Sequence, residues 1–199
     1  LMKSGIMSYD AINGARYYGV GNEYEGVTIA SAVFALAVLL NYKKISKWLA
    51  VVLSLVILIT SAMPSMGANV GGAISECVAY LLFILLIFDV KLDLKKIIMI
   101  GVATVLIVVL AKSSVWVNIL IVSIIIIGAL IFKPSGYFKK IHDKYPMIFK
   151  GFMASFVGCI VTLLVNDSGI VAASTAAIYI LIPIIIIGIN MIIFDKEID

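Results

Sequence analysis

The chain has 199 residues, of which 63% are hydrophobic and only 13% are charged, and its mean hydropathy is +1.20. A typical soluble domain is about 45–50% apolar and about 25% charged, so this composition excludes a water-soluble globular domain and a disordered chain. The net charge of +4 does not indicate nucleic-acid binding, because the basic residues lie between apolar segments. The sequence therefore predicts an all-α, polytopic bundle of transmembrane helices, a multi-pass protein of the cell membrane in contact with the lipid bilayer.

Residues 1–25 differ from the rest of the chain because they are polar, aromatic and glycine-containing. The chain begins at Leu1 and shows no charged n-region, short apolar core and cleavage site of a secretory signal peptide. We expect residues 1–25 to form an extracytoplasmic or interfacial lead-in segment. We also expect a further extracytoplasmic domain or partner on the N-terminal side of Leu1.

Seven apolar segments follow, and together they predict a membrane domain over residues 26–194. A membrane-spanning helix needs about 20 mostly apolar residues, with a range of about 17–25. The fourth and fifth segments could form one helix, but it would be far longer than a bilayer is thick, so a hairpin at residues 112–114 is preferred. The predicted spans cover residues 26–41, 48–63, 73–88, 97–111, 115–132, 147–165 and 172–194.

The distribution of lysine and arginine predicts the orientation of these spans. Of the 15 basic residues, all except Lys3, Arg16 and Lys112 fall on one side of the seven-span arrangement. Basic residues concentrate on the cytoplasmic side of membrane proteins. The N-terminus is therefore expected outside and the C-terminus inside, with residues 195–199 as a cytoplasmic tail. The basic loop at residues 133–150 is expected to lie at anionic lipid headgroups.

Polar residues on the predicted outer side are concentrated in three stretches, residues 13–26, 64–72 and 166–169. Each stretch precedes a span that begins with small residues, which allow helices to approach closely. The amide groups at the starts of three neighbouring helices would also favour an anionic ligand. The arrangement predicts a polar site at the outer face.

The side chains in these stretches suit a polar or anionic ligand. A guanidinium group binds phosphate or carboxylate through two hydrogen bonds, carboxylates bind cations or act as general bases, and amides orient polar groups. The alternative is that these residues serve only turns and the interfacial aromatic belt. The candidate binding residues are Arg16, Tyr17, Tyr18, Asn22, Glu23, Asn69, Glu76, Asn166, Asp167 and Ser168.

A shared site requires the three stretches to meet. We therefore expect the first, third and seventh spans to be neighbours at their outer ends, and Arg16 to face at least one of Glu23, Glu76 and Asp167. Glu76 lies about one turn inside the third span, where an isolated charge is costly. Its expected partner is Arg16 or an asparagine of the outer loops.

The sequence offers no ligand set for a metal ion or cofactor. Cys77 and Cys159 lie in different spans, and His142 is the only histidine. Glu76 is the one acid that we place inside a predicted span, which argues against a proton pump with a buried carboxylate relay.

The segment Ala-Arg-Tyr-Tyr-Gly-Val-Gly-Asn-Glu-Tyr at residues 15–24 resembles a segment of uncharacterised multi-spanning membrane proteins of Gram-positive bacteria. In that resemblance the membrane part follows an extracytoplasmic region. The resemblance implies no activity.

Three functions are compatible with these observations. The first is a membrane domain that binds, with or without transfer, a polar or anionic headgroup of the cell envelope, such as a lipid-linked ligand. The second is a carrier of a small solute or ion, which requires inward-facing polar residues such as Ser155, Thr162 and Ser174. The third is a structural anchor subunit of a larger complex, whose outer polar residues would face a protein partner. The sequence leaves open which of these applies, and whether the protein is an enzyme.

Overall fold

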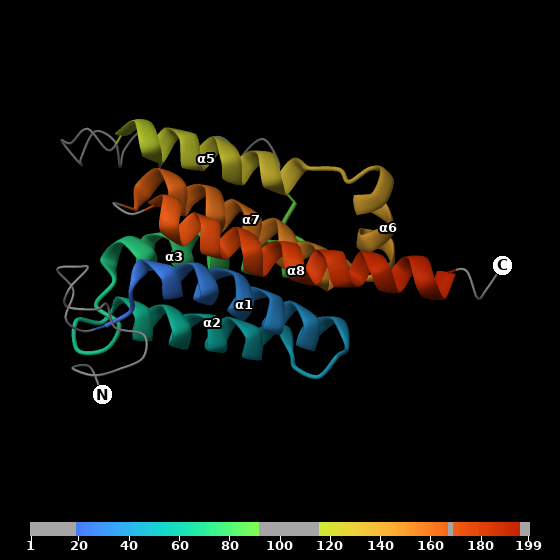
Figure 1. Ribbon diagram of the computed structural model, residues 1–199, viewed down its shortest axis with the longest axis horizontal. Coiled ribbons are helices and arrows are strands. Elements are labelled where there is room, and N and C mark those ends of the chain that lie inside the picture. Colours follow the sequence, from blue (N-terminus) through green and yellow to red (C-terminus); the bar gives the residue numbers. More distant parts are fainter. Residues whose placement is uncertain (1–18, 92–115, 167–168, 196–199) are drawn as a thin grey trace.

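The computed structural model describes residues 19–91, 116–166 and 169–195. Every regular element in these ranges is a helix, which confirms the predicted helical class for this part of the chain. All of the helices except α6 lie roughly along the long axis of the molecule (Figure 1). The helices are α1 (Asn22–Asn41), α2 (Lys47–Ala62), α3 (Val70–Ile87), α5 (Trp116–Ile131), α6 (Gly136–Lys144), α7 (Pro146–Val165) and α8 (Gly169–Asp195).

Among the described helices, α1, α7 and α8 are long and apolar enough to cross a membrane. A fourth crossing segment results if α5 and α6, which are bent by 69° relative to each other, are counted together. Helices α2 and α3 are apolar but shorter. The structure therefore supports a helical membrane protein. Six of the predicted spans coincide with described helices, and the predicted span at residues 97–111 lies outside the described residues.

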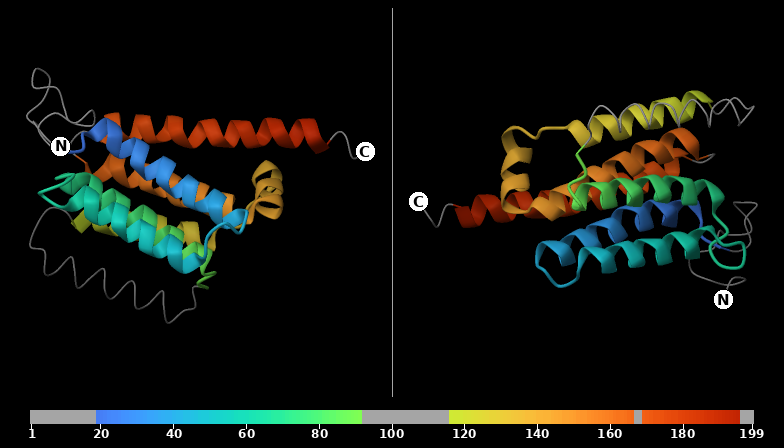
Figure 2. Two further views of the ribbon diagram at one scale, coloured as in Figure 1. Left: turned by 90° about the horizontal axis from the view of Figure 1, so that it is seen from below. Right: turned by 180° about the vertical axis from the view of Figure 1, so that it is seen from behind.

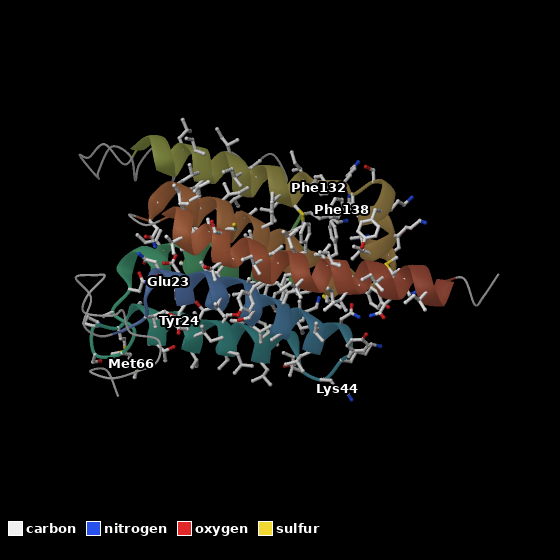
Figure 3. The ribbon with its side chains drawn as sticks, in the orientation of Figure 1. Glu23, Tyr24, Lys44, Met66, Phe132 and Phe138 are labelled. Carbon is white, nitrogen blue, oxygen red and sulfur yellow. The ribbon has the colours of Figure 1, made fainter. Side chains whose placement is uncertain are left out.

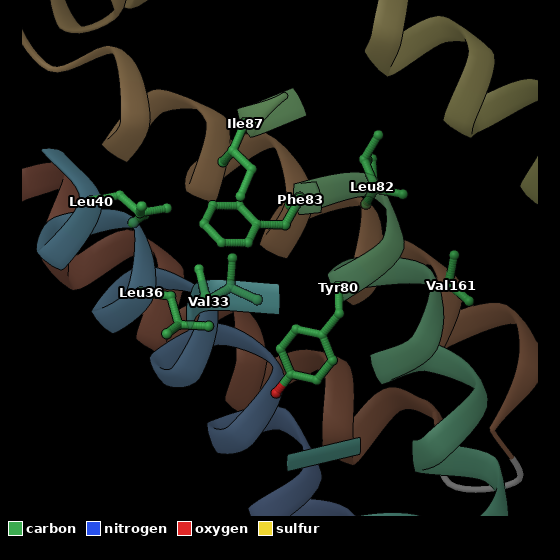
Figure 4. Packing of buried hydrophobic residues seen from close by; sticks show 12 residues of the cluster. Val33, Leu36, Leu40, Tyr80, Leu82, Phe83, Ile87 and Val161 are labelled. Carbon is green, nitrogen blue, oxygen red and sulfur yellow. The ribbon is translucent and has the colours of Figure 1, made fainter. Parts of the chain in front are cut away.

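The core lies where α7 packs against α1, α3 and α8. Figure 4 shows the largest buried cluster, in which Val33 of α1, Phe83 of α3 and Val161 of α7 are fully buried. Large apolar side chains also cover the outside, among them Val52 of α2 and Ile124 of α5. An apolar exterior around an apolar core is expected of a helix bundle surrounded by lipid.

The small residues at the helix starts do allow close packing. A Cβ atom built on Gly26 of α1 would lie 2.2 Å from the carbonyl oxygen of Ala172 in α8. Ala172 and Ala176 are fully buried at this contact. No side chain fits at position 26, so this glycine fixes how closely the starts of α1 and α8 approach.

Helix α1 begins at Asn22, whereas composition placed the end of the lead-in segment at residue 25. Gly21 occupies the N-cap position, and Glu23 and Glu25 lie in the first turn. Acidic side chains interact favourably with the positive end of the helix dipole. The correction matters because it moves the Glu25 carboxylate from a loop into a helix.

Helix α6 was expected to be a loop. It lies crosswise to the other helices (Figures 1 and 2) and packs on α7 through Ile141, which is fully buried. The ring of Phe138 stacks on that of Phe152 in α7, with centroids 5.4 Å apart. The hydroxyl of Tyr137 donates a 3.3 Å hydrogen bond to the carbonyl oxygen of Ile184 in α8. Helix α6 therefore contacts both α7 and α8.

The bundle has two chemically different ends. At what we call the polar end lie the starts of α1, α3, α5 and α8 and the ends of α2 and α7 (Figure 1). At the opposite end, here the basic end, lie α6 and the other helix termini. Figure 3 shows Glu23 and Tyr24 at the polar end, and Lys44 and Phe138 at the basic end.

Candidate functional site

A buried carboxylate, that of Glu25, lies at the centre of a cluster of polar side chains at the polar end. Glu25 is 1% exposed. Its Oε2 atom accepts hydrogen bonds from the Nδ2 atoms of Asn69, at 3.2 Å, and Asn166, at 2.5 Å. Its Oε1 atom accepts a longer bond, 3.5 Å, from the Thr162 hydroxyl. This carboxylate therefore joins α1 to the start of α3 and the end of α7.

Asn69 is held in place by three hydrogen bonds. As the N-cap of α3, its Oδ1 atom accepts a 2.8 Å bond from the Gly72 amide. Its Nδ2 atom donates to Glu25 and, at 3.2 Å, to the carbonyl oxygen of Val20. A Cβ atom on Gly72 would lie 2.8 Å from the carboxylate carbon of Glu25. Glycine at this position is what lets α3 approach the carboxylate.

Asn166 plays the corresponding part at the end of α7. It is the C-cap of that helix, and its Nδ2 atom reaches both Glu25 and, at 3.4 Å, the Oδ1 atom of Asn22. Asn22 and Asn166 are each 9% exposed, compared with 2% for Asn69. These two asparagines therefore form the more accessible edge of the cluster.

A second buried carboxylate, that of Glu76, lies one turn further along α3 than Gly72. Glu76 is 1% exposed. Its Oε1 atom accepts hydrogen bonds from the hydroxyls of Thr28, at 2.7 Å, and Ser61, at 3.1 Å. Within the described part of the chain its Oε2 atom has no hydrogen-bond partner. The expected partner was Arg16 or an asparagine of the outer loops; the described partners of Glu76 are the hydroxyls of Thr28 and Ser61, while Asn69 and Asn166 bond to Glu25, and Arg16 lies outside the described residues.

Two other buried hydroxyls also have no hydrogen-bond partner among the described residues. One is Tyr80, which is 2% exposed and follows Glu76 by one turn of α3. Figure 4 shows the Tyr80 hydroxyl directed toward α1. The other is Ser155 of α7, which is fully buried.

The structure brings together four of the predicted binding residues, Asn22, Asn69, Glu76 and Asn166, at the polar end. Glu23 lies on the same turn of α1 but is partly exposed, and its carboxylate is not one of the two buried ones. The other candidates lie outside the described residues, and so does the predicted contact between Arg16 and an acid. Those candidates are Arg16, Tyr17, Tyr18, Asp167 and Ser168.

The helices that form the site differ partly from those expected. Helix α1 does pack against both α3 and α8. However, the cluster also includes α7, which supplies Thr162 and, at its C-cap, Asn166. Sequence reasoning assigned residue 166 to the stretch before the seventh span and did not include the end of the sixth.

Sequence reasoning also missed Glu25, Thr28 and Ser61. One signal could have found the first two, because Asn22, Glu25 and Thr28 are spaced by three residues and so follow one face of a helix. No comparable signal marks Ser61, which reaches Glu76 only because α2 packs against α3.

The composition of the cluster limits its ligands. In residues 19–91, 116–166 and 169–195, no group of three or more His, Cys, Asp or Glu side chains could hold a metal ion. The hydrogen bonds described above come from neutral amides and hydroxyls. Burial among neutral groups favours the protonated form of a carboxyl group, so such a carboxylate is a site where a proton can bind.

Comparison with models of known protein families, with curated protein sequences and with solved structures finds no match. The resemblance of residues 15–24 to multi-spanning proteins of Gram-positive bacteria therefore stays a prediction. Any functional argument depends on the chemistry of the cluster.

Proposed function

We propose that this protein is an integral membrane carrier of a small ion, which it binds at the polar end of the bundle. The observation that carries the proposal is the pair of carboxylates, Glu25 and Glu76, each 1% exposed and placed inside helices. Ionisable residues at such positions in a membrane protein are costly and mark ion or proton pathways by default. This reverses our argument against a carboxylate relay, which counted one acid inside the spans.

The location of the cluster favours a carrier over the two other functions weighed from the sequence. An anchor subunit would direct its outer polar residues toward a protein partner, and a headgroup site would open toward lipid. Instead Asn69, Glu76 and Thr162 are 0–2% exposed and lie between helices of the same chain. The headgroup hypothesis now depends on Arg16 and its neighbours, which lie outside the described residues.

Buried polar groups also extend from the polar end into the bundle, as a carrier requires. Thr162 and Ser155, on the face of α7 that also carries Gly158, are fully buried. Ser174 does not belong to this set, because its side chain is exposed on α8. Glu76 and Tyr80 of α3 are the additional members.

We further propose the topology with seven spans, the polar end outside and the C-terminus inside. The described lysines support it, because all of them lie at or near the basic end, where a cytoplasmic surface would place them. A single-cysteine probe at Lys139 should resist a membrane-impermeant reagent applied from outside, whereas a probe at Lys112 should react. Cys77 and Cys159 must first be replaced by alanine, because Cys77 is exposed. The reverse labelling pattern would contradict the orientation.

The carrier function can be tested in proteoliposomes that contain the full chain. Proton flux is followed with an enclosed pH-sensitive dye, and Na⁺ and K⁺ fluxes are followed with radioactive tracers. We expect the protein to move at least one of these ions, and Glu76→Gln to reduce the rate at least tenfold. The matched control is Glu23→Gln, which changes a partly exposed acid near the start of α1 and should preserve the flux. Absence of flux for all three ions would overturn the proposal.

A further inference from the structure

We infer that Glu76 is a proton-binding site, in which the carboxyl group carries an exchangeable proton and Thr28, Ser61 and Tyr80 form its immediate polar surroundings. This inference rests on the proposed ion-carrier function only in naming the ion. Protonation of the carboxyl group itself can be observed without any transport.

The two oxygen atoms of Glu76 differ in their hydrogen bonds. Oε1 accepts two hydrogen bonds, from Thr28 and Ser61, as the carbonyl oxygen of a neutral carboxylic acid does. Oε2 has no partner among the described residues, although it is fully buried. An ionised carboxylate shares its charge between both oxygens, and burying one of them without a donor costs about 1–3 kcal/mol or more. Protonation at Oε2 removes the charge from this oxygen, and the resulting hydroxyl group needs a single acceptor.

The Thr28 hydroxyl lies within hydrogen-bonding distance of two acceptors. Its oxygen lies 2.8 Å from the carbonyl oxygen of Glu25 and 2.7 Å from Oε1 of Glu76. A hydroxyl group has one hydrogen to donate, and the carbonyl oxygen has none. That hydrogen can point to only one of these two acceptors at a time, while Ser61 supplies a further hydrogen bond to Oε1. Neither donor reaches Oε2, which is therefore the oxygen that can carry the proton.

The helices around Glu76 each contribute polar groups. Helix α1 contributes the Glu25 carboxylate, α2 contributes the neutral Ser61, and α7 contributes Thr162 beside Glu25. Helix α3 itself contributes Tyr80, whose hydroxyl is buried without a described partner. None of these described groups is a cation that would stabilise an ionised Glu76. The Tyr80 hydroxyl lies one turn deeper and makes no direct hydrogen bond to Oε2, so a water molecule between them would accept the hydrogen bond of the carboxyl proton.

The test is infrared difference spectroscopy of the full chain in phosphatidylcholine bilayers. We expect the C=O stretching band of a neutral carboxylic acid at neutral pH, with a shift in D₂O that shows exchange. Glu76→Gln, which retains the shape of the neutral acid, should remove the band, and Glu23→Gln should keep it. Thr28→Val and Ser61→Ala should move the band to higher frequency, because each removes a hydrogen bond to the carbonyl oxygen. Tyr80→Phe should slow the exchange.

The outcomes separate this inference from the carrier proposal. A band that persists in Glu76→Gln, or no band at neutral pH, would overturn the proton site even if ion flux is observed. A band lost in Glu76→Gln, in a protein that moves no ion, would support the proton site and contradict the carrier function. A band lost only in Glu25→Gln would assign the proton to the other carboxylate and would also overturn the inference.

Discussion

The two ends of the bundle hold acidic side chains in opposite ways. At the polar end, Glu25 and Glu76 are each 1% exposed and bond to amides and hydroxyls. At the basic end, the side chain of Asp89 is 65% exposed and pairs with Lys150, at 2.6 Å, and Lys47, at 3.8 Å. The exposed acid has charged partners, and exposed ion pairs contribute little to stability. The described hydrogen bonds of the two buried acids come from neutral amides and hydroxyls, and a buried hydrogen-bonding group is costly to leave unsatisfied.

This difference indicates different roles for the two ends. An exposed pair such as Asp89 with Lys150 fixes the relative position of α3 and α7 at small energetic gain. The buried carboxylates instead accept hydrogen bonds that join α1, α2, α3 and α7, so the packing of these four helices depends on a few hydrogen bonds. The comparison predicts that substitutions at the polar end affect both stability and ion binding, whereas those at the basic end affect neither strongly.

The largest effect is expected for Glu25→Ala. This change removes one hydrogen-bond acceptor from each of Asn69, Asn166 and Thr162, at a cost of about 1–3 kcal/mol for each buried donor hydrogen that loses its partner. We expect the free energy of unfolding in detergent, measured by chemical denaturation, to fall by at least about 3 kcal/mol. Glu23→Ala, on the same helix turn, should change it by less than about 0.5 kcal/mol. Similar losses in both variants would contradict the central role of Glu25.

A smaller loss is expected for Gly72→Ala. The added methyl group would meet the side chains of Glu25 and Asn69 at 2.8 Å, and overpacking of this kind costs about 1–3 kcal/mol. The matched control is Gly128→Ala in α5, where an added Cβ has no atom of the described residues within 4 Å. That variant should be neutral or stabilising, because alanine favours the helix. Thermal unfolding of the two variants side by side measures the difference.

Asp89→Asn should have a smaller effect, under about 1 kcal/mol, because the pair is largely solvated. The hydrogen bond from Lys150 lowers the pKa of Asp89 below its ordinary value. A lowered folded-state pKa stabilises the protein above the ordinary pKa, and that contribution is lost as the pH falls through the folded-state value. The stability difference between Asp89→Asn and the unchanged protein should therefore be constant near neutral pH and vanish in strong acid. A difference that grows on acidification would contradict this assignment.

The smallest expected effect is the dependence of these stability changes on ionic strength. Screening acts on exposed charges more than on buried groups. Raising the ionic strength should therefore diminish the effect of Lys47→Ala while leaving that of Asn69→Ala unchanged in the same denaturation assay. Equal salt dependence of the two variants would show that the Asn69 contacts are solvated.

The approximate positions of α1, α2, α3, α5, α7 and α8 could be predicted because long apolar segments are visible in composition alone. The start of α1 could not be predicted, because polar residues such as Asn22 and Glu25 are typical of loops. Their hydrogen-bond partners come from other helices, which the sequence does not relate to them. Helix α6 was missed for a related reason, because Ile141 is its one buried apolar residue and its contacts come from α7.

The asparagines of the site were predictable as residues that cap helices beside turns. The group to which they donate, the Glu25 carboxylate, was not predictable, because hydrogen bonds between α1, α3 and α7 depend on how the helices pack. Glu76 illustrates the limit most clearly. Its position one turn inside a span was evident, yet its partners, Thr28 and Ser61, come from helices that sequence spacing could not relate to it.

The crosswise helix α6 has a mechanical consequence. Through Phe138 it is attached to α7, and through Tyr137 to α8, while the short connection at residues 166–169 joins the same two helices at the opposite end. These connections hold α7 and α8 together at two separated points, so the two helices are expected to move as one unit. In the ion carrier that we propose, the motion that admits an ion to the carboxylates would then occur where α1 and α3 meet this pair, and the hydrogen bonds from Thr162 and Asn166 to Glu25 cross that boundary.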